Sequence, residues 1–323
     1  MGVSTPVVTA VAPPLPRHVA LLQRVIPPGL RGLLSYRRFA LASVVANVVI
    51  VVTGGAVRLS DSGLGCPTWP SCTDASLTPT HKYAIHGIIE FTNRQLTFVV
   101  AFLAIATWLI AMARIEQRLL ATLAALSIPA QAVLGGFTVL THLNPWLVGA
   151  HFLLSMAILF VTFWLWWRVR GSAPAADVPP AARQLARLTA LVSVAVLVLG
   201  TIVTGAGPHA GDKNSSGKVH RNGLMVSSMA QLHADSVMVL IGVSVGLLAL
   251  LYAVRAADVV LRAAWLLLAV ELAQGIVGYT QYFLHVPPIL VGLHMLGACL
   301  LWLAALHVLA RVEPRAATAT RTG

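Results

Sequence analysis

The sequence predicts an all-α integral membrane protein whose eight transmembrane helices form two tandem, parallel-repeat four-helix bundles. Composition is the first observation: of 323 residues, 58% are hydrophobic and only 10% are charged, and the mean hydropathy of +0.83 lies far above that of a water-soluble domain. The second observation is a series of continuous apolar runs, each long enough to cross a bilayer as a helix of roughly 20 residues. The third is an internal repeat.

Eight apolar runs follow one another along the chain, and each is predicted to be a helix. The lipid interior offers no water to backbone amides, and the runs are continuous rather than alternating, so helices are favoured over barrel strands. The runs cover residues 39–58, 86–112, 119–140, 146–167, 186–206, 229–252, 262–283 and 288–310.

Most of the 22 lysines and arginines gather at alternate ends of these runs. By the positive-inside rule both termini are predicted to be cytoplasmic. This placement accounts for the net charge of +12 without a nucleic-acid partner, and it predicts a multi-pass protein of the cell membrane, in contact with lipid. The loops expected to face outward are 59–85, 141–145, 207–228 and 284–287.

Two segments, QAVLGGFTVLTHLNPWLVGAH (131–151) and QGIVGYTQYFLHVPPILVGLH (274–294), match without a gap. VVTGG (51–55) and IVTGA (202–206) pair the first helix with the fifth. The chain is therefore predicted to be a duplication of a four-helix unit, and the even number of intervening spans makes the repeats parallel. The expected segments are a Pro-rich cytoplasmic tail (1–37), one bundle (38–170), a linker (171–184), a second bundle (185–311) and a cytoplasmic tail (312–323).

Polar residues inside the spans are costly and are therefore candidates for function. His151, His233 and His294 are expected at a similar depth near the outer face of the membrane. Glu90 and Asn93 are expected at that same depth on the second predicted helix, 86–112. Interhelical hydrogen bonding is the structural alternative. Three histidines at one depth on corresponding helices favour haem ligation instead.

Five segments resemble haem A synthase in its bacterial form: RLSDSGLGCPTWPSC, IIEFTNRQLT, VGAHFLLS, QLHADSVM and VGLHMLGACLLW. This family of membrane oxidoreductases oxidises the C8 methyl group of haem O to a formyl group, which gives haem A for cytochrome oxidases. The resemblance covers roughly residues 39–310. It implies a role in oxidase assembly, with haem O synthase and oxidase assembly factors as partners, and it leaves the electron donor unidentified.

The resemblance also implies roles for individual residues. His233 and His294 match the histidines that hold haem b, the redox cofactor, in the C-terminal half. In the N-terminal half, which takes the substrate haem, the match comprises His151 together with Glu90 and Arg94 of a Glu-x-x-His-Arg motif. No metal other than haem iron is expected.

Asn93 stands where that motif has histidine, and an amide is a poor ligand for haem iron. The favoured expectation is that His151 alone holds the N-terminal haem and leaves one iron face open. The alternative is a second ligand from His86 or from His81. Glu90 is expected to pass protons during the oxidation, and an ion pair with Arg94, one turn away, is the structural alternative.

Cys66 and Cys72 lie in the first outward loop. A structural disulfide and a relay of reducing equivalents both remain open for this pair. Two rival functions also remain: a di-haem electron-transfer protein of the cytochrome b kind, and a thiol–quinone oxidoreductase that uses these cysteines. Among the other polar residues, Gln131, Glu271 and Gln274 are expected to bridge helices, and WLWWR (164–168) is typical of an interfacial tryptophan belt.

Overall fold

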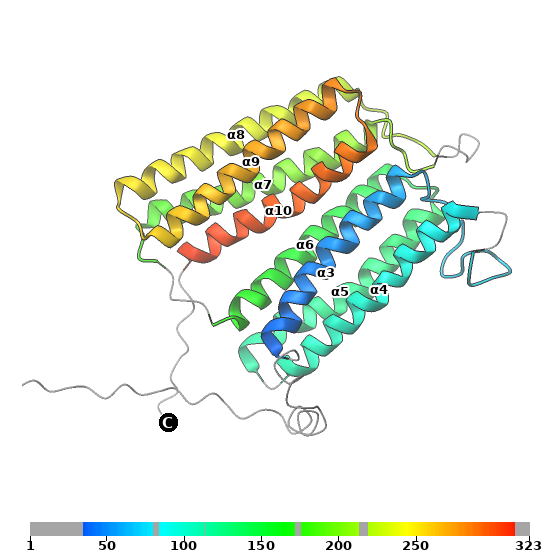
Figure 1. Ribbon diagram of the computed structural model, residues 1–323, viewed down its shortest axis with the longest axis horizontal. Coiled ribbons are helices and arrows are strands. Elements are labelled where there is room, and N and C mark those ends of the chain that lie inside the picture. Colours follow the sequence, from blue (N-terminus) through cyan, green and yellow to red (C-terminus); the bar gives the residue numbers. More distant parts are fainter. Residues whose placement is uncertain (1–34, 80–83, 113, 172–175, 213–218, 314–323) are drawn as a thin grey trace, which may run out of the picture.

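The computed structural model describes residues 35–79, 84–112, 114–171, 176–212 and 219–313. Most of both predicted tails, part of the linker and His81 lie outside these ranges. Within them the chain forms eight long helices (Figure 1). They are α3 (Tyr36–Leu59), α4 (Ala84–Ala111), α5 (Ile115–Leu140), α6 (Pro145–Val169), α7 (Pro180–Ala206), α8 (Val226–Ala253), α9 (Asp258–Phe283) and α10 (Pro288–Val312).

The helices form two four-helix bundles that lie side by side (Figure 1). In the first, α3 packs against α4 and α6, and α5 packs against α4 and α6. The second repeats this pattern with α7 to α10, and the bundles meet through α3, α6, α7 and α10. The predicted fold class is therefore confirmed.

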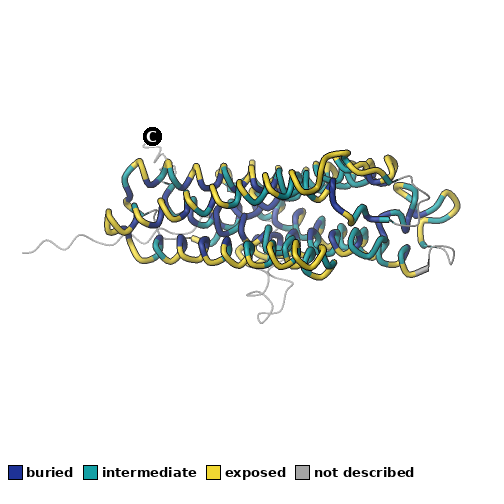
Figure 2. The backbone as a smooth tube through the Cα atoms, turned by 90° about the horizontal axis from the view of Figure 1, so that it is seen from above, coloured by how far each residue is buried: buried dark blue, intermediate teal, exposed yellow. Residues whose placement is uncertain are grey.

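All eight helices are long and apolar enough to cross a membrane. Buried residues follow the interior of the structure, and exposed ones follow its outer faces (Figure 2). Many exposed side chains are large and apolar, including Phe98, Phe102 and Ile276, which are between 63% and 70% exposed. Such a surface is suited to lipid rather than to water.

The helices extend beyond the apolar runs that predicted them. The largest difference is at α7, which begins at Pro180, whereas its run begins at 186. Hydropathy marks only the part of a helix that lies in hydrocarbon, and the hydrogen-bonded backbone continues into the interfacial region. Proline at the first helical position fits this extension, because its missing amide is not needed there.

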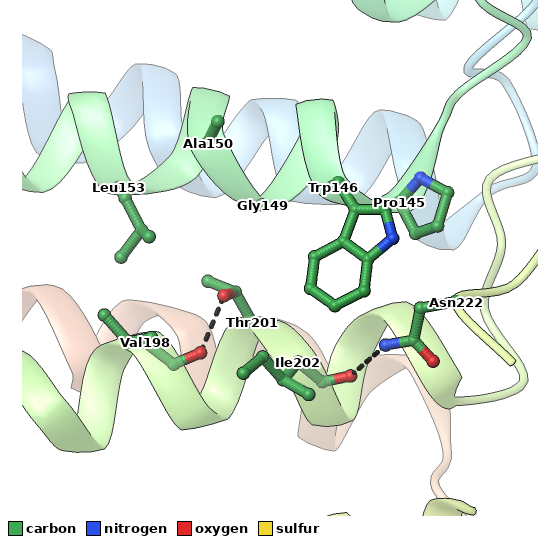
Figure 3. A pocket seen from close by; sticks show the side chains of 9 residues that line it. All are labelled: Pro145, Trp146, Gly149, Ala150, Leu153, Val198, Thr201, Ile202 and Asn222. Carbon is green, nitrogen blue, oxygen red and sulfur yellow. Dashed lines mark hydrogen bonds between the residues drawn. The ribbon is translucent and has the colours of Figure 1, made fainter. Parts of the chain in front are cut away.

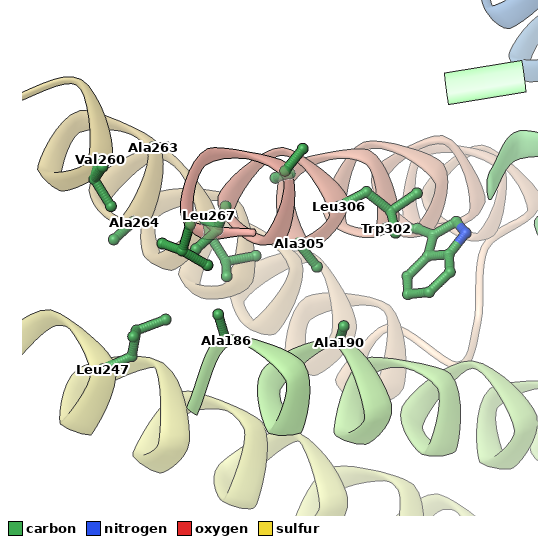
Figure 4. Packing of buried hydrophobic residues seen from close by; sticks show 14 of the residues in the cluster. Ala186, Ala190, Leu247, Val260, Ala263, Ala264, Leu267, Trp302, Ala305 and Leu306 are labelled. Atoms are coloured by element: carbon green, nitrogen blue, oxygen red, sulfur yellow. The ribbon is translucent and has the colours of Figure 1, made fainter. Parts of the chain in front are cut away.

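Small residues bring the helices of the second bundle close together (Figure 4). Ala186 and Ala190 of α7 face a layer built by Ala263 and Leu267 of α9 and by Leu306 of α10, all of them buried. Alanine at helix contacts permits the near approach that dispersion forces require in a membrane. Packing of this kind, rather than the hydrophobic effect, holds helices together in lipid.

A tryptophan links the two bundles. The Nε1 of Trp302 on α10 donates a hydrogen bond of 2.9 Å to the carbonyl of Met156 on α6. Trp167 also packs between the bundles, 4% exposed and 5.4 Å from the ring of His307. The prediction of an interfacial belt was therefore wrong for Trp167, because its helix faces the partner bundle rather than lipid at this position.

The outward loops join the bundles at one end of the molecule. Arg58, in the last turn of α3, donates hydrogen bonds to the carbonyls of His209 (2.7 Å) and Thr204 (3.2 Å). The ring of His209 in turn lies 2.8 Å from the carbonyl of Val286, between α9 and α10. At the opposite end, Arg187 forms an ion pair with Glu313 that holds the pKa of this carboxyl below its usual value.

The duplication extends to backbone detail in the turns after α5 and α9. His142 and Leu143 have φ angles of 53° and 59°, and His285 and Val286, at the matching positions, have 60° and 63°. Two successive left-handed residues without a glycine are uncommon. Their recurrence at the same place supports descent of both halves from one unit.

We expect Trp302→Phe to weaken the bundle interface by about 1 kcal/mol, the net value of one buried hydrogen bond. Trp164→Phe is the matched control, since the Nε1 of Trp164 is buried and has no hydrogen-bond partner within the described ranges, and both tryptophans pack on Phe160. Titration of the solubilised protein with a denaturing detergent, followed by circular dichroism, measures the difference. Equal losses in the two variants would show that the Trp302 bond contributes nothing.

Candidate functional site

His151 and His294 occupy equivalent positions in the two bundles. Each ring lies against a glycine of the neighbouring helix: a Cβ added at Gly135 of α5 would lie 3.0 Å from Cε1 of His151, and one added at Gly278 of α9 would lie 3.3 Å from Cε1 of His294. A larger residue at either glycine would press on the imidazole. The missing side chains therefore give both rings their room.

A glutamine holds the backbone of each of these histidines. Gln131 Nε2 donates to the His151 carbonyl at 2.9 Å, and Gln274 Nε2 donates to the His294 carbonyl at 2.8 Å. Gln131 also bonds Ser155 Oγ. The expectation that both glutamines bridge helices is confirmed, and the bridge fixes the height at which each histidine sits.

The second bundle brings its two predicted ligands together. His233 on α8 lies against Gly200 of α7, where an added Cβ would lie 3.3 Å from its Cε1. The ring centroids of His233 and His294 are 6.3 Å apart, with ring planes at 77°. Metal–imidazole bonds are about 2 Å long, so two imidazoles on opposite sides of one iron have ring centres roughly 6 Å apart. The observed spacing fits this arrangement.

The three imidazoles also carry unused polar atoms. The Nδ1 atoms of His151, His233 and His294 are buried and make no hydrogen bond in the described part of the chain, although the Val196 backbone lies close to the His233 ring. Buried polar groups are normally satisfied, and exceptions point to a redox or binding role. Histidines used only as links between helices would not show this pattern.

Asn93 occupies the fourth position, on α4 of the first bundle. Its Oδ1 is buried and has no hydrogen-bond partner among the residues that the structure describes, and an added Cβ at Gly54 of α3 would lie 3.7 Å from its Nδ2. The first bundle thus has one imidazole and one amide where the second has two imidazoles.

Glu90 and Arg94 bind the first outward loop. Glu90 is 5% exposed; its Oε2 accepts a hydrogen bond from the Cys66 amide at 2.7 Å, and its Oε1 accepts one from Arg94 Nη2 at 2.6 Å. Arg94 also donates to the carbonyls of Cys66 (2.9 Å), Thr68 (3.2 Å) and Ser71 (3.3 Å). The pair on α4 therefore anchors the loop over the end of the bundle.

Cys66 and Cys72 form a disulfide inside this loop, and both are 0% exposed. The disulfide expected from the sequence is confirmed. Beside it the loop packs closely on two helices: the backbone at Gly65 lies against that of His86, and the ring of Trp69 lies against Gly136 of α5. The loop is thus a lid fixed to one end of the first bundle.

His86, one candidate for a second iron ligand, lies in the first turn of α4 with its Nδ1 2.9 Å from Ser62 Oγ. This contact means that His86 uses its Nδ1 to bind the loop. The other candidate, His81, lies outside the described residues.

An apolar cavity of about 170 Å³ lies between α6 and α7, one residue away from His151 along α6 (Figure 3). Its two polar side chains are engaged within the protein: Thr201 Oγ1 donates to the carbonyl of Val198, and Asn222 Nδ2 donates to that of Ile202. The cavity offers space along the seam between the bundles but no reactive group.

These observations define a polytopic membrane protein with an imidazole site near the same end of each bundle. The family model described as cytochrome oxidase assembly protein, COX15-CtaA, matches residues 37–306. The chain belongs to this family.

Three relatives, each named Heme A synthase, show the extent of the similarity. The protein of Shewanella oneidensis is 28% identical over 179 residues, which are 50% of this chain and 53% of the relative. That of Lysinibacillus sphaericus is 35% identical over 123 residues (36% and 39%), and that of Exiguobacterium sibiricum is 29% identical over 167 residues (49% and 54%). The matched part of the chain spans about half or less of these relatives' lengths.

Replacing Arg94 by glutamine should loosen the loop, because the shorter neutral side chain cannot make the same set of hydrogen bonds. We expect Arg94→Gln to speed reduction of the Cys66–Cys72 disulfide by dithiothreitol at least several-fold, measured by thiol alkylation and mass spectrometry. Arg118→Gln is the control, since Arg118 in the first turn of α5 also donates to a backbone carbonyl, that of Met112, but at the other end of the bundle. Unchanged reduction in Arg94→Gln would mean that other contacts hold the loop closed.

Proposed function

We propose that this protein is a haem A synthase, a membrane oxidoreductase that converts the C8 methyl group of haem O to the formyl group of haem A for terminal oxidase assembly. The observation that carries the proposal is the repeated arrangement of Gln131, Gly135 and His151 in one bundle and Gln274, Gly278 and His294 in the other. It supplies one imidazole at the same place in each half. The family and the names of the relatives agree with this chemistry.

The second bundle, within residues 185–311, is proposed to hold haem b. His233 and His294 would hold its iron, since the 6.3 Å spacing of their ring centroids suits one metal ion between them. Gln274 fixes the His294 backbone, and Gly200 and Gly278 leave the rings free of side-chain pressure. When bound, the haem supplies a redox-active iron.

The first bundle, within residues 38–170, is proposed to take haem O as substrate and to release haem A as product. His151 is its iron ligand, and Asn93 contributes an amide rather than a second ligand. This asymmetry supports a division of work: the second bundle would hold a redox haem through two imidazoles, and the first would hold the substrate through one.

Glu90 is proposed to handle protons in this reaction. Its carboxylate accepts hydrogen bonds from the Cys66 amide and from Arg94. It can therefore take up a proton when one of these hydrogen bonds breaks. Arg94 keeps the carboxylate in place and ties its position to that of the loop. In this arrangement the disulfide serves the site by fixing the loop that carries the Cys66 amide.

The protein is proposed to lie in the bacterial cell membrane with both termini cytoplasmic, as the arginines at the α3 start and the α4, α6 and α8 ends indicate. Haem O synthase and oxidase assembly factors are its proposed partners. A thiol–quinone oxidoreductase is less well supported, because Cys66 and Cys72 are fully buried and thiol exchange requires access to sulfur.

Expression in a host without its own haem A synthase tests the proposal. The wild-type chain should convert haem O to haem A, detected by pyridine haemochrome spectra and chromatography of extracted haem. Glu90→Gln should lower haem A by at least tenfold and leave haem O or a hydroxymethyl product. Glu116→Gln, an exposed acid at the other end of the first bundle, should behave as wild type.

Failure of the wild-type chain to form haem A, with its haem b bound, would favour a di-haem electron-transfer protein. Full haem A formation by Glu90→Gln would remove Glu90 from the chemistry and leave the pair with Arg94 as a loop anchor only.

A further inference from the structure

Glu271 is a buried acid in the second bundle that the proposed reaction does not use. It lies in the middle of α9 and is 0% exposed. Its Oε1 accepts a hydrogen bond of 2.7 Å from Ser244 Oγ on α8. Its Oε2 is buried and has no hydrogen-bond partner among the described residues.

A single hydrogen bond offsets little of the free-energy cost of burying a carboxyl group in hydrocarbon. A serine or an asparagine could bridge α8 and α9 without an ionisable group, and an unpaired acid inside a membrane is a strong sign of function. The matching position in the first bundle is Ile128, so the fold does not need an acid there. We therefore expect the carboxyl group to serve a function that is specific to the second bundle.

The position of Glu271 connects it to the proposed haem b site. Gln274 lies one turn further along α9 and donates to the carbonyl of His294. One turn of helix is about 5 Å, so Glu271 lies one turn below the level at which the iron ligand is anchored. It is on the side of the iron site that faces the predicted cytoplasmic end.

Three buried hydroxyl groups lie on the helices of the second bundle near the level of Glu271 or closer to that end. Thr189 and Ser193 of α7 and Ser244 of α8 are each at most 3% exposed. Ser244 binds Glu271 directly, whereas Thr189 and Ser193 donate to carbonyls of their own helix.

No salt bridge fixes the charge of Glu271 within the described chain. Asp235 is bound by Gln231, His307 is bound by Arg311, and Cys299 is a buried thiol. The ionisable groups on the helices packed against α9 are His233, Asp235 and Tyr252 of α8, and His294, Cys299, His307 and Arg311 of α10.

We propose that Glu271 takes up a proton when the haem iron held by His233 and His294 is reduced, and releases it on reoxidation. One electron, from a one-electron reductant or a hydroquinone, converts ferric to ferrous haem. One proton from water converts the Glu271 carboxylate to the acid, so that the charge inside the bundle does not change. Burial makes such compensation valuable, since an uncompensated charge in low dielectric is costly. This inference rests on the proposed haem b site.

The test is redox potentiometry of the full-length protein with the haem it retains on purification, from mildly acidic to mildly alkaline pH. The midpoint potential of the wild-type haem should fall as pH rises, because protonation accompanies reduction. Glu271→Gln keeps the size of the side chain and an acceptor for Ser244. It should flatten this dependence and raise the potential at alkaline pH, where a negative charge has been removed.

Asp258→Asn, at the exposed start of the same helix, is the control and should keep the wild-type dependence. Should Glu271→Gln not accumulate, redox-induced infrared difference spectra of the wild type and Ser244→Ala decide the matter. Reduction should produce a protonated-carboxyl band, and its frequency should shift in Ser244→Ala, where one hydrogen bond to the carboxyl is lost.

A wild-type pH dependence in Glu271→Gln, or the absence of a carboxyl band that responds to Ser244→Ala, would overturn the inference and leave Glu271 as a link between helices. Neither result would touch the proposed function. A preparation in which the wild-type chain binds no haem would instead contradict the proposed function, and this inference with it.

Discussion

His151 and His294 can lie inside their bundles because the neighbouring helix gives each ring room and fixes the position of its backbone along the bundle. A glycine supplies the room and a glutamine binds the histidine backbone. This pair recurs in each half, on α5 and on α9. The rest of the architecture follows from this constraint. Because both histidines lie near one end, the polar chemistry of the molecule gathers there, and the remaining length of each bundle can pack as alanine and leucine.

The two bundles differ in the residues for which we propose different functions. The second bundle has two imidazoles at iron spacing and the buried acid Glu271, and the first has one imidazole, the amide of Asn93 and a lid bound by Glu90 and Arg94. A duplication that keeps its scaffold and changes a few interior residues yields two sites with different chemistry. Links such as Arg58 to His209 and Trp302 to Met156 keep these sites in one rigid unit.

Much of this could be predicted from the sequence, because membrane helices and an ungapped repeat leave strong periodic signals. The eight spans, the repeat register and the common depth of the histidines all depend on such signals. The loop contacts could not be predicted: Arg94 binds backbone carbonyls, which no residue pattern reveals, and the Ser62 contact of His86 depends on how the loop folds back. The burial of Trp167 escaped prediction because hydropathy does not distinguish lipid from a partner helix.

The most direct measurement is the haem content of the purified full-length protein and of His294→Ala, by pyridine haemochrome. His285→Ala, an exposed histidine in the turn before α10, is the reference. If glycine and glutamine hold His294 ready for iron, the wild type and His285→Ala should retain the same low-spin haem, and His294→Ala should lose it. Equal haem in all three proteins would contradict an iron site between α8 and α10.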